Sequence, residues 1–150
     1  MKSCSVPNEI QTAVIDIVRN MGYSKCLKGI RPKSLEGKIV SDADMCDAIG
    51  SSGIIRAIVY AVSDKGSGTI FDRNLFPNEN ISQEEYNSGG TTHKTDNAIN
   101  HFFEKLLKLK DLMMTDSGKR EAVKRQRIMV DFIRNFFEEE NVPQKWFELL

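Results

Sequence analysis

Apolar residues in this chain recur mostly every three or four positions, which is the spacing of one face of an α-helix. The first such stripe consists of Ile10, Val14, Ile17 and Val18. It predicts an amphipathic helix that begins at Pro7, a residue suited to the first helical turn, and ends near Met21, before Gly22. The basic stretch that follows, residues 23–33, contains glycine and an Arg-Pro pair and predicts an irregular loop.

The next predicted helix spans residues 34–49, with Ser34 as its N-cap. It carries three acids, Asp42, Asp44 and Asp47, within six residues of an otherwise apolar run, so we expect most of this segment to be buried. Burying a carboxylate is costly unless a positive group pairs with it. The segment therefore predicts either nearby cations or a bound metal ion.

Residues 54–62 are apolar except for Arg56. We expect a buried helix there, although the β-branched residues leave a strand open as an alternative, and Arg56 should have an anionic partner. Residues 64–96 are rich in Gly, Asn, Ser and Thr and predict a long loop with a short helical turn at residues 82–87. A loop of this length within a compact domain is usually functional or mobile.

The C-terminal third of the chain carries two strong helical stripes. The first spans residues 99–113 behind Asp96 or Asn97 as N-cap, and the second follows a break at residues 115–118 and ends at residues 138–140, with Pro143 as a stop beyond it. The apolar face of the second consists of Ala122, Gln126, Met129, Ile133, Phe136 and Phe137. The short connection between the two helices predicts an antiparallel hairpin.

These elements predict an all-α fold of about five helices in a single domain. The domain would comprise helices over residues 7–63, a long loop over 64–96, a helical hairpin over 97–140 and an apolar tail over 141–150. A chain of 150 residues is long enough to bury one hydrophobic core.

The charge balance and the distribution of apolar residues indicate which classes of partner and location to expect. Twenty-one Lys and Arg residues offset 21 Asp and Glu residues, so net charge predicts no affinity for nucleic acid or for a membrane surface. No apolar run reaches membrane-spanning length, and the N-terminus lacks the apolar core of a signal peptide. Three cysteines without a C-x-x-C pair favour a reducing compartment, so we expect a cytoplasmic protein, with a Cys26–Cys46 disulfide as the minor alternative.

Candidate chemistry concentrates in the acid cluster. On a helix Asp44 and Asp47 share a face, while Asp42 points the other way. Two carboxylates can contribute to a Mg²⁺ or Mn²⁺ site but supply too few ligands alone. The alternative is that the acids form ion pairs. The candidate partners are Arg31, Lys38 and Arg56.

Other catalytic signatures are missing from the sequence. Neither histidine, His93 or His101, belongs to an H-x-x-x-H or H-E-x-x-H pair, and there is no P-loop, EF-hand loop or G-x-S-x-G elbow. His101 is expected to be a hydrogen-bonding residue on a helix flank. Cys46 lies among acids, which would raise its pKa and make it a poor nucleophile.

Three blocks of the sequence nevertheless match a known pattern. The first is residues 35–50 followed by residues 53–56, which read LEGKIVSDADMCDAIG and GIIR, and the second is residues 99–113, INHFFEKLLKLKDLM. A weaker third block consists of Ala122, Arg125, Met129 and Phe132. In this order they resemble the small bacterial branch of the HD-domain phosphohydrolases, over nearly the whole chain from residue 7.

The resemblance implies an HD-domain-like helical bundle that binds a divalent metal (Mn, Mg, Fe or Co), which activates water for attack on a phosphate ester. It assigns the metal ligand of the first block to Asp44. The supporting residues in the two blocks are Asp42, Asp47, Arg56, His101 and Lys105. The implied ligand is a phosphorylated small molecule or a nucleotide.

The departures from the family pattern are as informative as the match. The chain has no His-Asp dipeptide and no histidine before His93, and Met45 and Cys46 replace the Arg and Leu usual in the first block. We therefore expect the C-terminal part of an HD bundle that lacks its N-terminal helices, as a truncated product or a degenerate paralogue, with weak or no metal binding. Apolar surface left exposed by the missing helices predicts homo-oligomers. The alternative function is a non-catalytic helical interaction or oligomerisation module.

Overall fold

The structure is a computed structural model that describes residues 6–78 and 97–150. Over these residues it is all-helical, without strands, which confirms the predicted fold class. Its elements are α1 (Asn8–Asn20), α2 (Tyr23–Leu27), α3 (Leu35–Asp47), α4 (Gly50–Val62), α6 (Ala98–Glu104), the 3₁₀-helix η2 (Leu106–Leu112), α7 (Asp116–Glu139) and the 3₁₀-helix η3 (Gln144–Leu149). The helical turn expected at residues 82–87 lies outside the described residues, as does His93.

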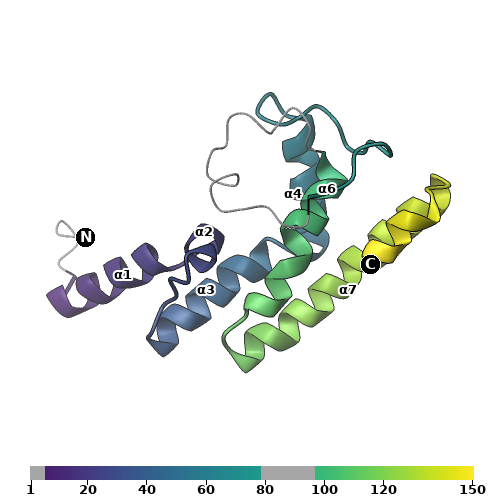
Figure 1. Ribbon diagram of the computed structural model, residues 1–150. Coiled ribbons are helices and arrows are strands. Elements are labelled where there is room, and N and C mark those ends of the chain that lie inside the picture. Colours follow the sequence, from purple (N-terminus) through teal and green to yellow (C-terminus); the bar gives the residue numbers. More distant parts are fainter. Residues whose placement is uncertain (1–5, 79–96) are drawn as a thin grey trace.

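Helix α7 is the longest element and packs against α3, α4 and η2. In Figure 1, α3, the η2 segment and α7 lie side by side, with α1 and α2 at one end. The predicted apolar face of α7 is buried in this arrangement through Ala122, Met129, Ile133 and Phe137. The same core contains Met45, Ile49, Phe102, Leu109 and Trp146.

Side-chain caps start three of these helices; the sequence predicts Ser34 as the first, Asp96 or Asn97 as the second, and a break at residues 115–118 where the third lies. The caps are Ser34, Asn97 and Thr115. Their side-chain oxygens accept hydrogen bonds of 3.1, 2.8 and 3.0 Å from the backbone N–H three residues further on. Each cap satisfies a backbone donor that has no carbonyl partner within its own helix.

The apolar segment after the acid cluster is a helix and not a strand. Helix α4 starts at Gly50 and is bent by 60° from α3. Gly50 has a φ of +79°, a region that favours glycine, and a Cβ atom on Gly53 would lie 2.4 Å from the Ala48 carbonyl oxygen. The two glycines therefore permit the sharp junction at which α3 and α4 stay in contact.

The prediction of one continuous helix over residues 99–113 is wrong, because the helix is interrupted at Lys105. Helix α6 ends at Glu104, Lys105 has non-helical backbone angles (φ −139°, ψ −59°), and the chain continues as η2. Neither Gly nor Pro marks this position, so the local pattern carries no signal for the break. The apolar stripe survives it because Leu106 and Leu109, three residues apart, both face the core from a 3₁₀-helix.

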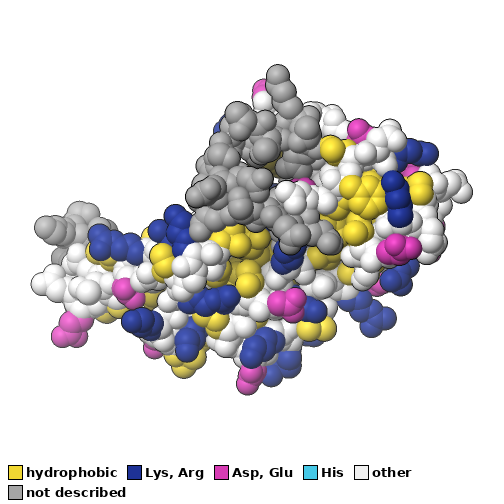
Figure 2. All heavy atoms as spheres, viewed as in Figure 1, with side chains coloured by type: hydrophobic (Ala, Val, Ile, Leu, Met, Phe, Trp, Pro, Cys, Tyr) yellow, Lys and Arg dark blue, Asp and Glu magenta, His cyan; other side chains and the backbone are white. Residues whose placement is uncertain are grey.

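Two apolar stretches are more exposed than predicted. No residue of α1 is buried, and its stripe residues Ile10 and Val18 are 53% and 64% exposed. In α3, Ile39 and Val40 are 51% and 42% exposed, so this helix buries one face and not most of its surface. Figure 2 shows apolar side chains at the surface among charged ones over α1 and α3. Helix α1 contacts α3 and lies at the edge of the described part of the molecule.

The apolar C-terminal tail folds back onto the core as η3. Trp146 is fully buried, with its ring centroid 5.1 Å from that of Phe71 and 4.3 Å from that of Phe76. It also lies 5.7 Å from the ring of Phe137 on α7. These aromatic contacts hold the irregular segment after α4 against the end of the chain.

No single helix among the described residues is long and apolar enough to span a membrane. The bent pair α3 and α4 passes such a test together, by length and composition alone. Both helices contribute to the core, through Met45 and Ile54 for example.

Candidate functional site

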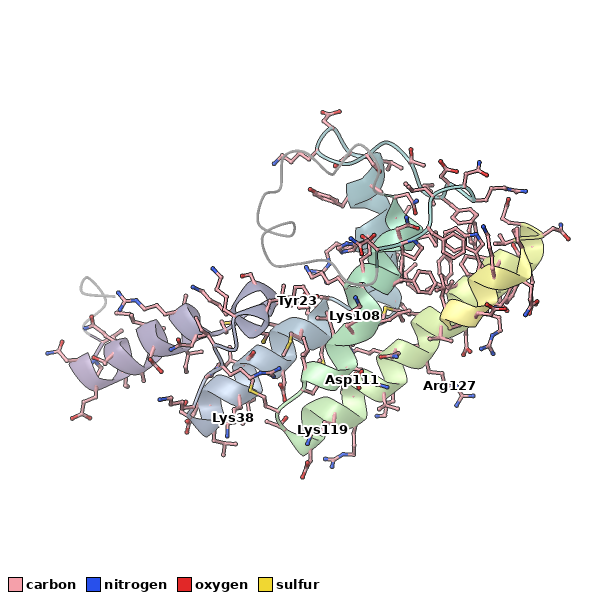
Figure 3. All side chains as sticks on the ribbon, viewed as in Figure 1. Tyr23, Lys38, Lys108, Asp111, Lys119 and Arg127 are labelled. Atoms are coloured by element: carbon pink, nitrogen blue, oxygen red, sulfur yellow. The ribbon has the colours of Figure 1, made fainter. Side chains whose placement is uncertain are left out.

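A pocket of about 320 Å³ lies where α2, α3, α4 and the α6–η2 junction meet. It is lined by Tyr23, Ser24, Asp44, Met45, Asp47, Ala48, Arg56, Lys105 and Leu109. Figure 3 shows the position of Tyr23 at the start of α2, beside α3. Four of the site residues expected from the sequence meet in this pocket, namely Asp44, Asp47, Arg56 and Lys105.

The three acids of α3 separate as their spacing predicts. Asp44 and Asp47 line the pocket, whereas Asp42 faces the other side of the helix and is only 2% exposed. The Asp42 carboxylate accepts hydrogen bonds from the backbone N–H of Met114 (2.9 Å) and of Thr115 (2.7 Å), and from the Thr115 hydroxyl (2.7 Å). Asp42 therefore ties α3 to the start of α7 through neutral donors, which neither the ion-pair nor the metal prediction anticipated.

The predicted anionic partner of Arg56 is Asp47. Nη1 of Arg56 lies 3.0 Å from Oδ2 of Asp47, and Nη2 donates to the Asp47 backbone carbonyl. The two side chains are 55% and 72% exposed, so this ion pair contributes at most about 1 kcal/mol to stability. Its main effect is to orient a guanidinium group at the C-terminal end of α3, where a positive charge is favourable.

Lys105 lines the same pocket from a different segment, the α6–η2 junction. Its ammonium nitrogen lies 5.1 Å from the centroid of the Tyr23 ring, which is a cation–π contact. Lys105 occupies the break between α6 and η2, and Leu109, one turn later, lines the same pocket. The contact between Tyr23 and Lys105 thus joins α2 to the α6–η2 junction, two segments that lie far apart in the sequence.

Two residues that line the pocket, Tyr23 and Ser24, are not predicted from the sequence. Tyr23 and Ser24 fall in a stretch expected to be an irregular loop, but residues 23–27 form the short helix α2 after Gly22, whose φ is +96°. A helix of one turn has too few residues to show a periodic pattern, so the sequence carried no signal for it. His101 lies half-buried on α6 and is not among the residues that line the pocket.

The cysteines do not form the alternative disulfide. Cys26 and Cys46 are both buried and free. Burial raises the pKa of the Cys46 thiol; Arg125 opposes this rise, while Asp42 and Glu121 add to it. The direction is the one predicted, although burial and not the neighbouring acids is the main cause. A buried thiol of raised pKa is a poor nucleophile.

The described residues alone do not make up a metal site. Within residues 6–78 and 97–150, no three His, Cys, Asp or Glu side chains come close enough together to hold an ion. Asp44 offers one carboxylate, and Asp47 is already bonded to Arg56. Divalent ions in proteins take about four to eight ligands, so these two carboxylates fall short of a coordination shell.

Comparison with known proteins places the chain beside bacterial proteins of the same fold. No protein-family model matches it. The chain is 35% identical over 139 residues to the uncharacterized protein YpgQ of Bacillus subtilis, which covers 92% of this chain and 56% of YpgQ. A crystal structure of a Lactobacillus plantarum protein is 38% identical with a TM-score of 0.79, and the match covers 95% of this chain and 66% of that one.

The crystal structure of an HD-superfamily hydrolase from Bacillus thuringiensis is 34% identical with a TM-score of 0.67, over 95% of this chain and 59% of that one. The chain has the fold of an HD-superfamily hydrolase. B. subtilis YpgQ in complex with ADP is 30% identical with a TM-score of 0.60, over 90% of this chain and 55% of that one. The chain therefore spans between 55% and 66% of the length of these relatives.

Proposed function

We propose that this chain is a homologue of HD-superfamily phosphohydrolases whose pocket binds a phosphate-bearing small molecule, with a nucleotide such as ADP as the best-supported ligand. The observation that carries the proposal is the convergence of both resembling blocks on one pocket. The first block contributes Asp44, Asp47 and Arg56, and the second contributes Lys105. The hydrolase from B. thuringiensis and the ADP complex of the B. subtilis relative support the same ligand class.

The chemistry of the pocket suits a phosphate ester. Arg56 and Lys105 supply positive charge for phosphate oxygens, and Asp44 is the exposed carboxylate that the resemblance assigns to a metal. Because the described residues fall short of a metal site, we propose ligand binding for this chain and not turnover by it alone.

Titration of the chain with ADP by calorimetry, in EDTA, tests the proposal. We expect saturable binding that is lost when Ala48→Trp fills the pocket, because Ala48 is part of its lining. Ala43→Trp, at an exposed position of α3 outside the pocket, is the matched control and should bind like the wild type. Absence of ADP binding by the wild type, or equal binding by Ala48→Trp, would contradict the proposal.

A Mn²⁺ titration of the same protein tests the predicted shortage of metal ligands. We expect weak or no binding, since two carboxylates do not complete a coordination shell. Micromolar Mn²⁺ binding that is abolished by Asp44→Ala would show that the site is complete.

A second candidate function is a helical interaction module that forms homo-oligomers. The exposed apolar residues of α1, α3 and α4 favour it. Ile55 and Val59 on α4 are 64% and 59% exposed, and Ile10 and Val18 on α1 are 53% and 64% exposed. Residues four apart share a helix face, and an exposed apolar face commonly marks a contact with another polypeptide.

A further inference from the structure

The break between α6 and η2 places one particular cation in the pocket. The apolar spacing over residues 99–113 is that of an uninterrupted helix, yet the helix stops at Lys105 without a Gly or a Pro. The break falls at the one residue of this segment that is both charged and part of the pocket lining. A feature that the local sequence does not require is therefore located at a pocket residue.

The Lys105 side chain lies against an aromatic ring. The Tyr23 ring, from α2, lies 5.1 Å from its ammonium nitrogen. Tyr23 is the first residue of α2 and follows Gly22, whose positive φ turns the chain there. A flexible four-carbon side chain loses much conformational freedom when it binds a ligand. An aromatic face that already holds the ammonium group reduces that loss.

A further observation is the division of charge in the pocket. Arg56 bonds both the side chain and the backbone carbonyl of Asp47, which fixes its guanidinium at the α3–α4 side. Lys105 comes from the α6–η2 segment. A phosphate group can bond cations from two separate segments at once, because it carries several acceptor oxygens.

We propose that Lys105 is the phosphate-binding residue of this pocket and that Tyr23 positions it. The proposal rests on the proposed function, since it names the residue that recognises the phosphate of the ligand. It does not depend on a metal.

The test compares ADP and adenosine binding in EDTA at two salt concentrations. For Lys105→Met we expect the Kd for ADP to rise by about tenfold or more, because a charged hydrogen bond to phosphate is lost, while adenosine binding is unchanged. Lys105→Arg should retain binding within about threefold, and the salt dependence of ADP binding should be weaker in Lys105→Met only. Lys119→Met is the control, since this exposed lysine lies at the start of α7, away from the pocket (Figure 3).

Tyr23 is tested as a positioning residue. Tyr23→Leu should raise the Kd for ADP several-fold. Tyr23→Phe should keep the Kd of the wild type, because the ring and not the hydroxyl makes the cation–π contact. Circular dichroism of each variant checks that the helical content is unchanged. If the wild type binds ADP and Lys105→Met binds equally well, Lys105 is not the phosphate-binding residue; if the wild type binds no ADP, the proposed function itself fails.

Discussion

Three aspartates of one short segment have three different roles. Asp42 is buried and receives backbone and hydroxyl donors, Asp44 lines the pocket, and Asp47 pairs with Arg56. Part of the reason is angular, because Asp42 leaves α3 on the face opposite the one that Asp44 and Asp47 share. Only the Asp42 direction points into the protein. There a Cβ atom on Gly118 would lie 2.4 Å from the Asp42 carboxylate, so glycine at that position leaves the room that the carboxylate fills.

Asp42→Ala is predicted to lower the free energy of unfolding by about 3 kcal/mol, because it leaves the N–H groups of Met114 and Thr115 buried without their acceptor. Urea denaturation followed by circular dichroism measures this. Asp44→Ala is the matched control: it removes an exposed carboxylate of the same helix and should change stability by less than about 0.5 kcal/mol. Equal effects of the two substitutions would contradict the anchoring role of Asp42.

At the scale of elements, side chains of α7 bond the C-terminal end of α3. Nη1 of Arg125 donates to the Cys46 carbonyl near the C-terminal end of α3 at 3.0 Å, and Glu121 accepts from Nε of Arg125 at 2.8 Å. The Arg125 side chain is thus a second donor to a carbonyl near a helix end, which also accepts from the Ile49 N–H, while Glu121, one turn earlier on α7, holds the guanidinium in position. These bonds lie in the N-terminal half of α7, whereas Phe137, its contact with Trp146 of η3, lies near its C-terminal end.

The Glu121–Arg125 pair predicts a pH dependence of stability. The hydrogen bond from Arg125 lowers the pKa of Glu121 below its ordinary value of 4.5. A carboxyl with a lower pKa in the folded state stabilises the fold above its unfolded pKa, and this stabilisation is lost as the pH falls through the folded pKa. Glu121→Gln should therefore unfold at a lower urea concentration than the wild type at pH 7, and the difference should vanish well below pH 4.5.

The control for this prediction is Arg125→Met. In that background Glu121→Gln should have a much smaller effect on the urea midpoint at pH 7, because only the exposed Lys124 ammonium, 3.7 Å from the Glu121 carboxylate, is left to pair with it. If the urea midpoint of the wild type still exceeds that of Glu121→Gln by the same amount at the lowest pH, the charge of the Glu121 carboxylate is not the cause of the difference.

At the scale of the whole molecule, α1 is the least integrated element. Its apolar stripe predicts a buried face, but none of its residues is buried, and an amphipathic helix of 13 residues is only marginally stable without tertiary packing. This exposed apolar stripe is the basis for proposing self-association through α1.

Sedimentation equilibrium over a wide concentration range tests the expectation. The wild type should form concentration-dependent dimers or larger species, and Val14→Asp combined with Val18→Asp should shift it towards monomer, because both residues are on the exposed apolar stripe. Thr12→Asp adds a charge on the opposite face of α1 and should leave the assembly unchanged. A wild type that stays monomeric at every concentration would rule out this use of α1.

The sequence by itself determined the all-α class, the cap Ser34 and the shared face of Asp44 and Asp47, because periodicity, caps and angular spacing are local properties of a helix. The tertiary structure alone decided that Asp42 accepts bonds from the start of α7 and that the chain breaks at Lys105 beside the Tyr23 ring. Both depend on contacts between residues more than 70 positions apart, which no short stretch of sequence encodes.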